Sequence, residues 1–270
     1  MFNNIIQRLL AVAVLSGTVI GSQMLERKSF ENYLTSTSKE EAKLADNTLS
    51  SRLRVARLSP SFGFDNTVAN SIFVQFLQYF GDDAARAQTG YQKSPDFFEA
   101  IINHDPSYRN FYIFLSGSST LYAGNPEKST ALMETGLGML KPNQPSDSYF
   151  IWRYKGVDEL LFLGDSKAAR ASFLSASEWA EQSQDKDSDR VGKLSRRTSE
   201  FLADNPDSRT AQIDAWSSLL GTALDNNTRK RAVEKIEKLG GSVAISESGG
   251  ISIQYEKAEN ADKALDNPDI

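Results

Sequence analysis

Few residues in this sequence are of the types that carry catalysis, and their spacing does not bring them together. There is no cysteine and only one histidine, His104, which excludes thiol chemistry, disulfides and clusters of imidazole ligands for a metal. Adjacent carboxylates occur at Asp82-Asp83 and at Asp158-Glu159. Neighbours on a helix point about 100° apart, so neither pair forms an acid–base couple by itself. We therefore predict that the protein is not an enzyme and that it uses no cofactor or metal.

The remaining candidates for chemistry are better explained as ends of helices. His104 comes just before Asp105-Pro106, at the predicted C-terminus of a helix, where a histidine interacts favourably with the helix dipole. The glycines form neither of the two common phosphate-binding patterns, G-x-G-x-x-G and G-x-x-x-x-G-K. We expect these glycines to terminate helices instead.

The composition favours a folded protein that does not bind nucleic acid. Of the 270 residues, 40% are hydrophobic and 24% are charged, so a hydrophobic core is expected. The net charge is -5, whereas nucleic-acid binding requires a strongly basic surface. Nucleic acid is therefore not an expected partner.

The mainly apolar stretch from Leu9 to Leu25 predicts a single-pass membrane anchor within residues 1–28. As a helix it would span about 26 Å, against a hydrocarbon core of about 30 Å. A cleaved secretory signal is an alternative, because Val19 and Gly21 stand where a signal peptidase could accept small residues, and a buried helix is another. A short leading apolar segment usually directs the chain across the membrane, so we expect the body on the periplasmic or lumenal side.

Residues 29–62 are rich in polar side chains and are predicted to form a spacer. At its end, arginines alternate with apolar residues: Arg52, Leu53, Arg54, Val55, Arg57 and Leu58. This alternation indicates either the solvated end of the spacer or a segment that lies on a membrane surface.

Apolar residues at helical spacing, separated by glycine turns, predict an all-α solenoid of helical hairpins over residues 63–182. Gly81, Gly124 and Gly164 end successive first helices and lie 43 and 40 residues apart. The second helices begin with a capping residue, a proline and an acid. Two such starts are Ser94-Pro95-Asp96 and Asn125-Pro126-Glu127.

The third hairpin has its turn, its two small contact residues and its large one at the offsets of a tetratricopeptide repeat. These residues are Gly164-Asp165, Ala169, Ala176 and Phe173. Over Asn66 to Ala180 the chain therefore resembles degenerate tetratricopeptide-like proteins, especially membrane-anchored ones of the cyanobacterial type. The resemblance implies a solenoid that binds proteins without chemistry. The chain departs from the family because its period exceeds the usual 34 residues, Gly136 occupies a small-residue position in the second hairpin, and the first hairpin holds an inserted loop.

If the glycines set the repeat frame, a groove for a protein or peptide partner is expected on the inner side of the first helices. Its polar positions would be Gln75, Gln78, Tyr79, Ser118, Tyr122, Tyr154 and Asp158. Apolar residues would lie between them: Phe111, Phe114, Leu121 and Phe162. Tyrosine rings supply buried area and the polar groups satisfy the backbone of an extended peptide or a helix. The alternative is that the core fills this side as well.

The C-terminal part predicts a cap followed by a tail. Residues 183–255 contain further helices and a β-hairpin, because Ser242–Ser246 and Ile251–Tyr255 alternate apolar and polar side chains around a glycine-containing turn. We expect these elements to cover the last apolar face of the solenoid, as a terminal repeat must. Residues 256–270 predict an acidic, disordered tail.

The leading functional hypothesis is a membrane-tethered, tetratricopeptide-like scaffold that binds a protein partner during assembly of a membrane complex. The alternative is an exported small-ligand binding protein or hydrolase with a pocket between the repeats and the cap, in which Arg153, Asp158 and Glu159 are the first residues to test. A third hypothesis is a structural subunit of a permanent complex, which would leave apolar patches uncovered in the monomer.

Overall fold

The computed structural model describes residues 39–222, 225–245 and 251–255. The predicted anchor at residues 9–25 and the predicted tail lie outside these ranges. The chain divides into two compact units, Met1–Leu49 and Ser50–Ile270, and the described part of the first unit is the beginning of helix α2 (Lys39–Leu58). Among the described residues, no helix combines the length and the apolarity needed to span a bilayer.

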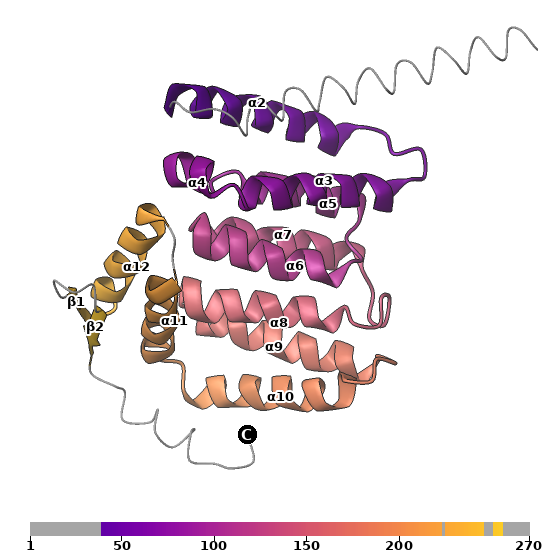
Figure 1. Cartoon of the computed structure of the whole chain (residues 1–270). Coiled ribbons are helices and arrows are strands. Elements are labelled where there is room, and N and C mark those ends of the chain that lie inside the picture. The colour runs from indigo at the N-terminus through magenta and orange to yellow at the C-terminus, as the bar shows by residue number, and fades with distance from the viewer. Residues whose placement is uncertain (1–38, 223–224, 246–250, 256–270) are drawn as a thin grey trace, which may run out of the picture. The chain divides into compact units, whose positions relative to one another are not determined.

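The second unit consists mainly of helical hairpins, which confirms the predicted all-α class with a small C-terminal β-hairpin (Figure 1). The first helices of three hairpins are α3 (Asp65–Phe80), α6 (Arg109–Leu115) and α8 (Tyr149–Asp158). Their second helices are α5 (Ser94–His104), α7 (Pro126–Met139) and α9 (Ser166–Glu181). Two π-helices continue α6 and α8, namely η1 (Ser116–Tyr122) and η2 (Glu159–Leu163). Helix α10 (Ser188–Asp204) packs against α9 as the last layer of the stack (Figure 1).

Part of the predicted spacer is folded, because α2 occupies residues 39–58. Leu53 is buried, and two backbone carbonyls of α2 accept hydrogen bonds from the end of α5. The Nδ2 of Asn103 donates to the carbonyl of Arg57 at 2.9 Å, and the Nε2 of His104 lies 2.8 Å from the carbonyl of Ala56. The polar composition concealed this packing, since a helix that covers one layer needs only a narrow apolar stripe.

The turns at Gly124 and Gly164 have the same construction. Both glycines are left-handed, with φ of 66° and 70°, which a glycine adopts without steric cost. The next residue in each case donates its N–H six residues back, from Asn125 to the carbonyl of Ser119 and from Asp165 to the carbonyl of Glu159, at 2.9 Å in both. The side chains of these two residues then cap the second helices α7 and α9. The two hairpins are therefore repeats of one design.

Gly81 does not form the equivalent turn that its spacing predicted. Its φ is -84°, and the short helix α4 (Asp83–Thr89) starts directly after it with Asp82 as its cap. The left-handed glycine of the first hairpin is Gly90, with φ of 69°, which lies 34 residues before Gly124. Spacing alone could not identify the right glycine, because each of the two follows a helix.

Aromatic rings from three helices form the centre of the first hairpin. Phe76 of α3 makes edge contacts with Phe97 and Phe98 of α5, with ring centroids 5.8 and 4.7 Å apart. Phe73 contacts Phe111 and Phe114 of α6 at 5.0 and 5.1 Å. These contacts fix α3 beside both its own partner helix and the next hairpin.

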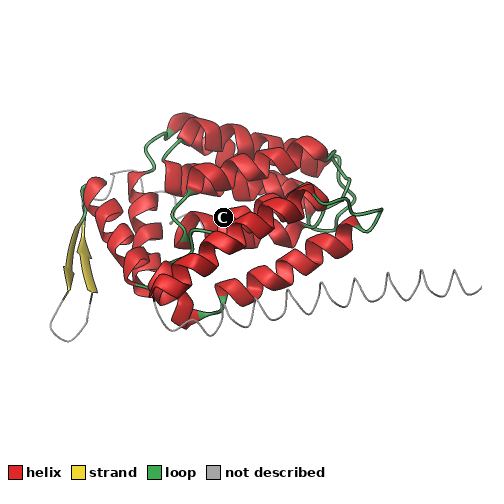
Figure 2. Ribbon diagram, turned by 90° about the horizontal axis from the view of Figure 1, so that it is seen from above, coloured by secondary structure: helices red, strands yellow, loops and turns green. Residues whose placement is uncertain are grey.

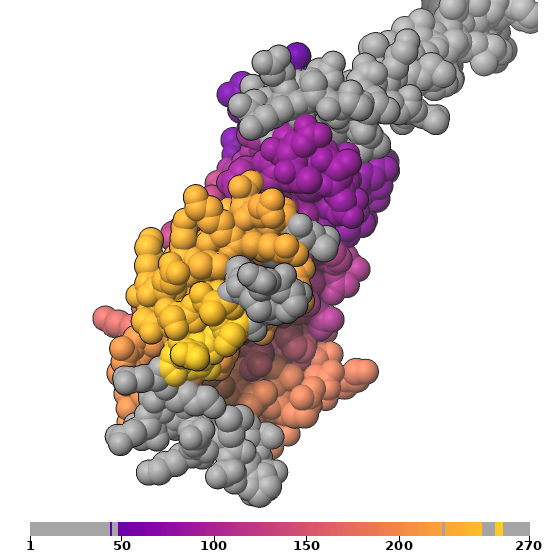
Figure 3. All heavy atoms as spheres, turned by 60° about the vertical axis from the view of Figure 1, so that its left-hand side comes forward, coloured from indigo at the N-terminus to yellow at the C-terminus, as the bar shows by residue number. Residues whose placement is uncertain are grey.

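The C-terminal helices α11 (Arg209–Thr222) and α12 (Asn226–Lys238) do not continue the stack. They pack against the turn ends of the second and third hairpins, where Leu121 and Phe162 adjoin their core and the rings of Phe162 and Trp216 lie 5.2 Å apart. Figure 3 shows these elements, in orange and yellow, over that side of the unit. The C-terminal helices were expected to cover the last apolar face of the stack, but they cover its side. The last layer of the stack is α10.

The β-hairpin lies beside α12, as Figure 2 shows at the edge of the helical body. Strands β1 (Ser242–Ile245) and β2 (Ile251–Gln254) pair antiparallel, with Ser242 opposite Gln254. Val243 and Ile253 pack on the core of α11 and α12. This packing stabilises a two-stranded hairpin that would be marginal alone.

Candidate functional site

The structure separates the seven predicted groove positions into buried and accessible ones. Tyr79, Ser118 and Asp158 are fully or almost fully buried. Gln75, Tyr122 and Tyr154 are half-buried, and Gln78 is exposed. A buried side chain cannot line an open groove, so the seven residues do not form one surface, and for three of them the core does fill this side.

Tyr79 has a structural environment. Its hydroxyl donates to the carbonyl of Gly90 at 3.3 Å and accepts from the N–H of Lys93 at 3.2 Å. The guanidinium of the buried Arg86 lies 3.7 Å from the centre of its ring and donates to the same carbonyl at 2.6 Å. Tyr79 therefore holds the turn between α4 and α5.

Tyr122 joins two parts of the fold. Its ring contacts Phe80 and Tyr91 with centroids 5.1 and 4.9 Å apart. Its carbonyl accepts a hydrogen bond at 3.0 Å from Arg231 of α12. Tyr122 thus links the first two hairpins to the C-terminal helices.

Tyr154 belongs to an aromatic group on α8 that remains partly accessible. Its ring lies 6.3 Å from that of Phe150, over which the guanidinium of Arg109 sits at 4.6 Å. Arg109 is also 3.4 Å from the carboxylate of Asp147. Burial raises the pKa of the Tyr154 hydroxyl above its ordinary value.

The accessible apolar surface of the first helices lies on α3 and α6. Five residues define what we call the α3–α6 face: Val74, Leu77, Gln78, Ile113 and Phe114. Its four apolar side chains are 40 to 53% exposed. The ring contact between Phe73 and Phe114 places the two helices side by side at this point. The predicted groove included Gln78 and Phe114. It missed Val74, Leu77 and Ile113, which are apolar residues exposed on their helices.

Asp158 is the centre of a buried polar cluster between the second and third hairpins. Its carboxylate accepts hydrogen bonds from Ser116 and Thr120, both at 2.6 Å, and from Ser129 at 3.0 Å. Burial raises the pKa of Asp158 to about 6, against the opposing effect of these three hydroxyl donors. Every contact is made within the fold, so Asp158 joins the repeats rather than facing a ligand.

The neighbouring residues proposed for a hydrolase pocket are engaged in a similar way. Glu159 is buried, with the ammonium of Lys155 at 2.6 Å and the hydroxyl of Ser172 donating at 2.6 Å. Arg153 donates to Ser195 at 2.9 Å and lies 5.9 Å from the centre of the Phe173 ring. These residues stabilise the contacts among α8, α9 and α10. Within the described ranges, no three acidic or histidine side chains gather as ligands for a metal.

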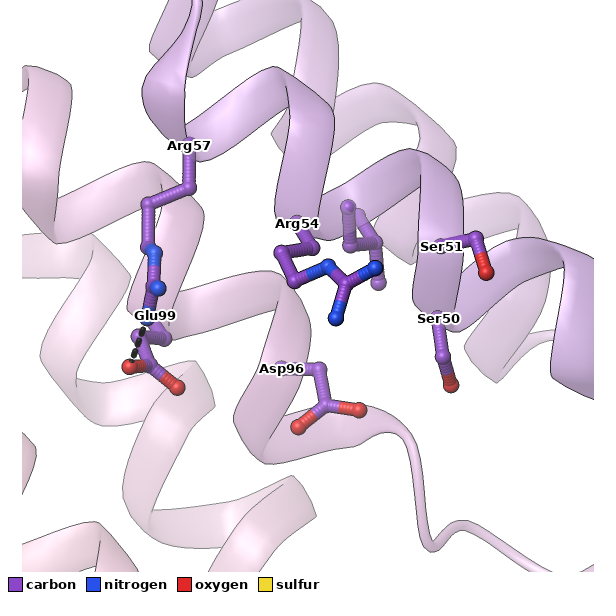
Figure 4. A pocket seen from close by; sticks show the side chains of 7 residues that line it. Ser50, Ser51, Arg54, Arg57, Asp96 and Glu99 are labelled. Carbon is purple, nitrogen blue, oxygen red and sulfur yellow. Dashed lines mark hydrogen bonds and ion pairs between the residues drawn. The ribbon is translucent and has the colours of Figure 1, made fainter.

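Two clefts between neighbouring helices are lined by other residues. One, of about 270 Å³, lies between α2 and α5, where Arg57 pairs with Glu99 and Arg54 faces Asp96 (Figure 4). The other, of about 280 Å³, lies between α9 and α10, with the surface pair Lys193–Asp189 at its rim. Charges of both signs line each cleft, so neither favours one class of charged ligand.

No family model, curated protein or solved structure matches this chain.

Proposed function

We propose that the protein is a membrane-tethered, tetratricopeptide-like scaffold that binds a protein partner through the α3–α6 face. The observation that supports this proposal is the group of four large, exposed apolar side chains on two adjacent first helices. Large exposed apolar side chains on adjacent elements mark interaction sites more often than isolated ones do. The exposed amide of Gln78 would supply a polar contact beside them.

The chemistry of the face favours a helical partner. Leu77 and Phe114 offer apolar contact, while the face has no row of unpaired backbone groups onto which an extended strand could add. An amphipathic helix would bury its own apolar stripe against them. The role in assembling a membrane complex follows from the predicted tether at residues 9–25, which would hold the module close to membrane partners.

The test is co-purification from detergent extracts of the full chain and of two double variants, with quantification of captured proteins by mass spectrometry. Leu77→Gln with Ile113→Gln should lose the specific partner, because a polar group replaces each apolar contact. Met139→Gln with Leu174→Gln is the matched control on the second helices, since these side chains are also exposed. Equal capture by the two double variants would remove the α3–α6 face from consideration.

The side of the membrane has a separate test, because the chain has no cysteine. A single Asn70→Cys variant, at an exposed position of α3, should react with a membrane-impermeant maleimide in intact cells if the body lies outside the cytoplasm. Reaction only after lysis would refute a periplasmic location.

A further inference from the structure

A second apolar surface lies where the end of α2 connects to the start of α3. Val55, Leu58, Phe62 and Phe64 are 64 to 86% exposed. Each of the four is more exposed than any other large apolar side chain described in the second unit. Exposing so much apolar area in ten residues is unfavourable unless another phase or molecule covers it.

The connecting loop holds its two phenylalanines in a defined turn. Phe62 and the following Gly63 are both left-handed, with φ of 51° and 87°. The N–H of Phe64 donates to the carbonyl of Ser61 at 2.9 Å, and the hydroxyl of Ser61 bonds to Asp65. A left-handed phenylalanine costs on the order of 1 kcal/mol. The turn thus fixes Phe62 in a conformation that leaves its ring in solvent.

The positive charges beside these apolar residues favour contact with a negatively charged surface. Arg52 and Arg54 are exposed on α2, three residues and one residue before Val55, and the side chain of Arg54 points toward Asp96 in Figure 4. Two carboxylates lie near these arginines, and each has a polar neighbour within the fold. Asp65 accepts from Ser61 and lies 3.7 Å from His104, and Asp96 lies inside the cleft across from Arg54. The net charge of -5 would otherwise repel an anionic surface.

We propose that the surface formed by Val55, Leu58, Phe62 and Phe64 inserts into the interface of an anionic lipid bilayer, with Arg52 and Arg54 on the head groups. Exposed rings on a turn, flanked by arginines, fit the boundary between head groups and acyl chains. The surface follows the predicted anchor in sequence, so a membrane is the apolar phase expected nearest to it. The inference adds a second membrane contact to the proposed tether and does not depend on the α3–α6 face.

The experiment uses the full chain with a single cysteine that carries an environment-sensitive fluorophore. Phe62→Cys places the probe in the loop, and Phe201→Cys places it at an exposed position of α10. Each labelled protein is mixed with phosphatidylcholine vesicles, with or without phosphatidylglycerol. Flotation reports binding of the chain, and emission wavelength and iodide quenching report insertion of the probe.

We expect a blue shift and several-fold weaker iodide quenching for the Phe62 probe on anionic vesicles, and no change for the Phe201 probe. The double variant Arg52→Gln with Arg54→Gln removes both positive charges. The ratio of inserted to free loop should then fall by a factor on the order of ten. Equal quenching of the Phe62 probe with and without vesicles, in a chain that floats, would overturn the inference and leave the tether intact. A chain that does not float would overturn both the insertion of this surface and the proposed tether. Partner capture by the α3–α6 face would remain a separate result.

Discussion

Arg231 of α12 lies directly against Gly124, the turn glycine of the second hairpin. Its guanidinium donates to the carbonyls of Leu121 and Tyr122 at 3.3 and 3.0 Å, and a Cβ on Gly124 would come within 2.2 Å of the guanidinium carbon. These carbonyls end η1, so the arginine satisfies groups that a helix terminus leaves free.

The other left-handed turn glycines have C-terminal neighbours as well. A Cβ on Gly164 would lie 3.0 Å from the side-chain nitrogen of Gln212, and one on Gly90 would lie 3.8 Å from that of Asn227. The helices α11 and α12 therefore follow the row of turns. They connect the three hairpins at one end, in addition to the stacking of each hairpin on the next.

Gly124→Ala should destabilise the protein by about 2 kcal/mol or more, because a side chain there is both left-handed and in contact with Arg231. Urea unfolding, followed by far-UV circular dichroism, measures this free energy. The matched control is Gly138→Ala, where a Cβ meets nothing within 4 Å inside α7. That variant should be neutral or stabilised by up to about 1 kcal/mol.

The double variant Gly124→Ala with Arg231→Ala separates contact from backbone strain. Removing the guanidinium relieves the contact, so the two substitutions should cost clearly less together than the sum of their separate costs. Strict additivity would mean that Arg231 does not lie against the turn.

Asp158→Asn should change how stability depends on pH. Burial raises the pKa of Asp158 in the folded protein to about 6 from an ordinary value of 3.8, so the folded state favours the protonated form. This contribution to stability is fully present below pH 3.8 and is lost as the pH rises through about 6, a change of about 3 kcal/mol. An asparagine has no such loss and can still bond to the three hydroxyls.

The measurement is the free energy of unfolding of both proteins at several pH values from about 3 to about 7.5, a range that brackets the two pKa values of 3.8 and about 6. The wild type should lose more stability than the variant as the pH rises. Parallel curves for the two proteins would show that Asp158 does not titrate with a raised pKa.

Lys155→Met should be strongly destabilising, by about 3 kcal/mol, because it leaves the carboxylate of Glu159 buried without its cationic partner. Thermal and urea unfolding measure the effect. Lys193→Met removes an exposed pair with Asp189 and should change stability by less than about 1 kcal/mol. Glu159→Gln in the Lys155→Met background should recover part of the loss, and a failure to do so would contradict the account of this pair.

The sequence predicted the hairpins well where local signals were strong. Gly124-Asn125-Pro126 combines a left-handed glycine, a cap and a proline, and each part has the expected role. Gly81 ends α3 as predicted, but the left-handed glycine of this hairpin is Gly90, because a helix end alone does not reveal the sign of φ. The lateral position of α12 depends on Arg231 reaching carbonyls more than a hundred residues away, for which no local signal exists.

The groove positions were predictable only in part, for a related reason. A repeat frame gives the face of a helix on which a residue lies, but the burial of that face depends on the neighbouring layer. Tyr79 faces a turn that α4 brings onto it, and Asp158 meets hydroxyls from η1 and α7. Such contacts between distant segments determine whether a face is open.

Binding of a protein partner by the α3–α6 face, as proposed above, is tested most directly by the affinity of the purified partner for three proteins. Isothermal titration should give equal dissociation constants for the wild type and for Met139→Gln with Leu174→Gln. For Leu77→Gln with Ile113→Gln the dissociation constant should rise at least about tenfold, since two apolar contacts are lost. An unchanged constant for that variant, in a protein that remains folded, would contradict the claim.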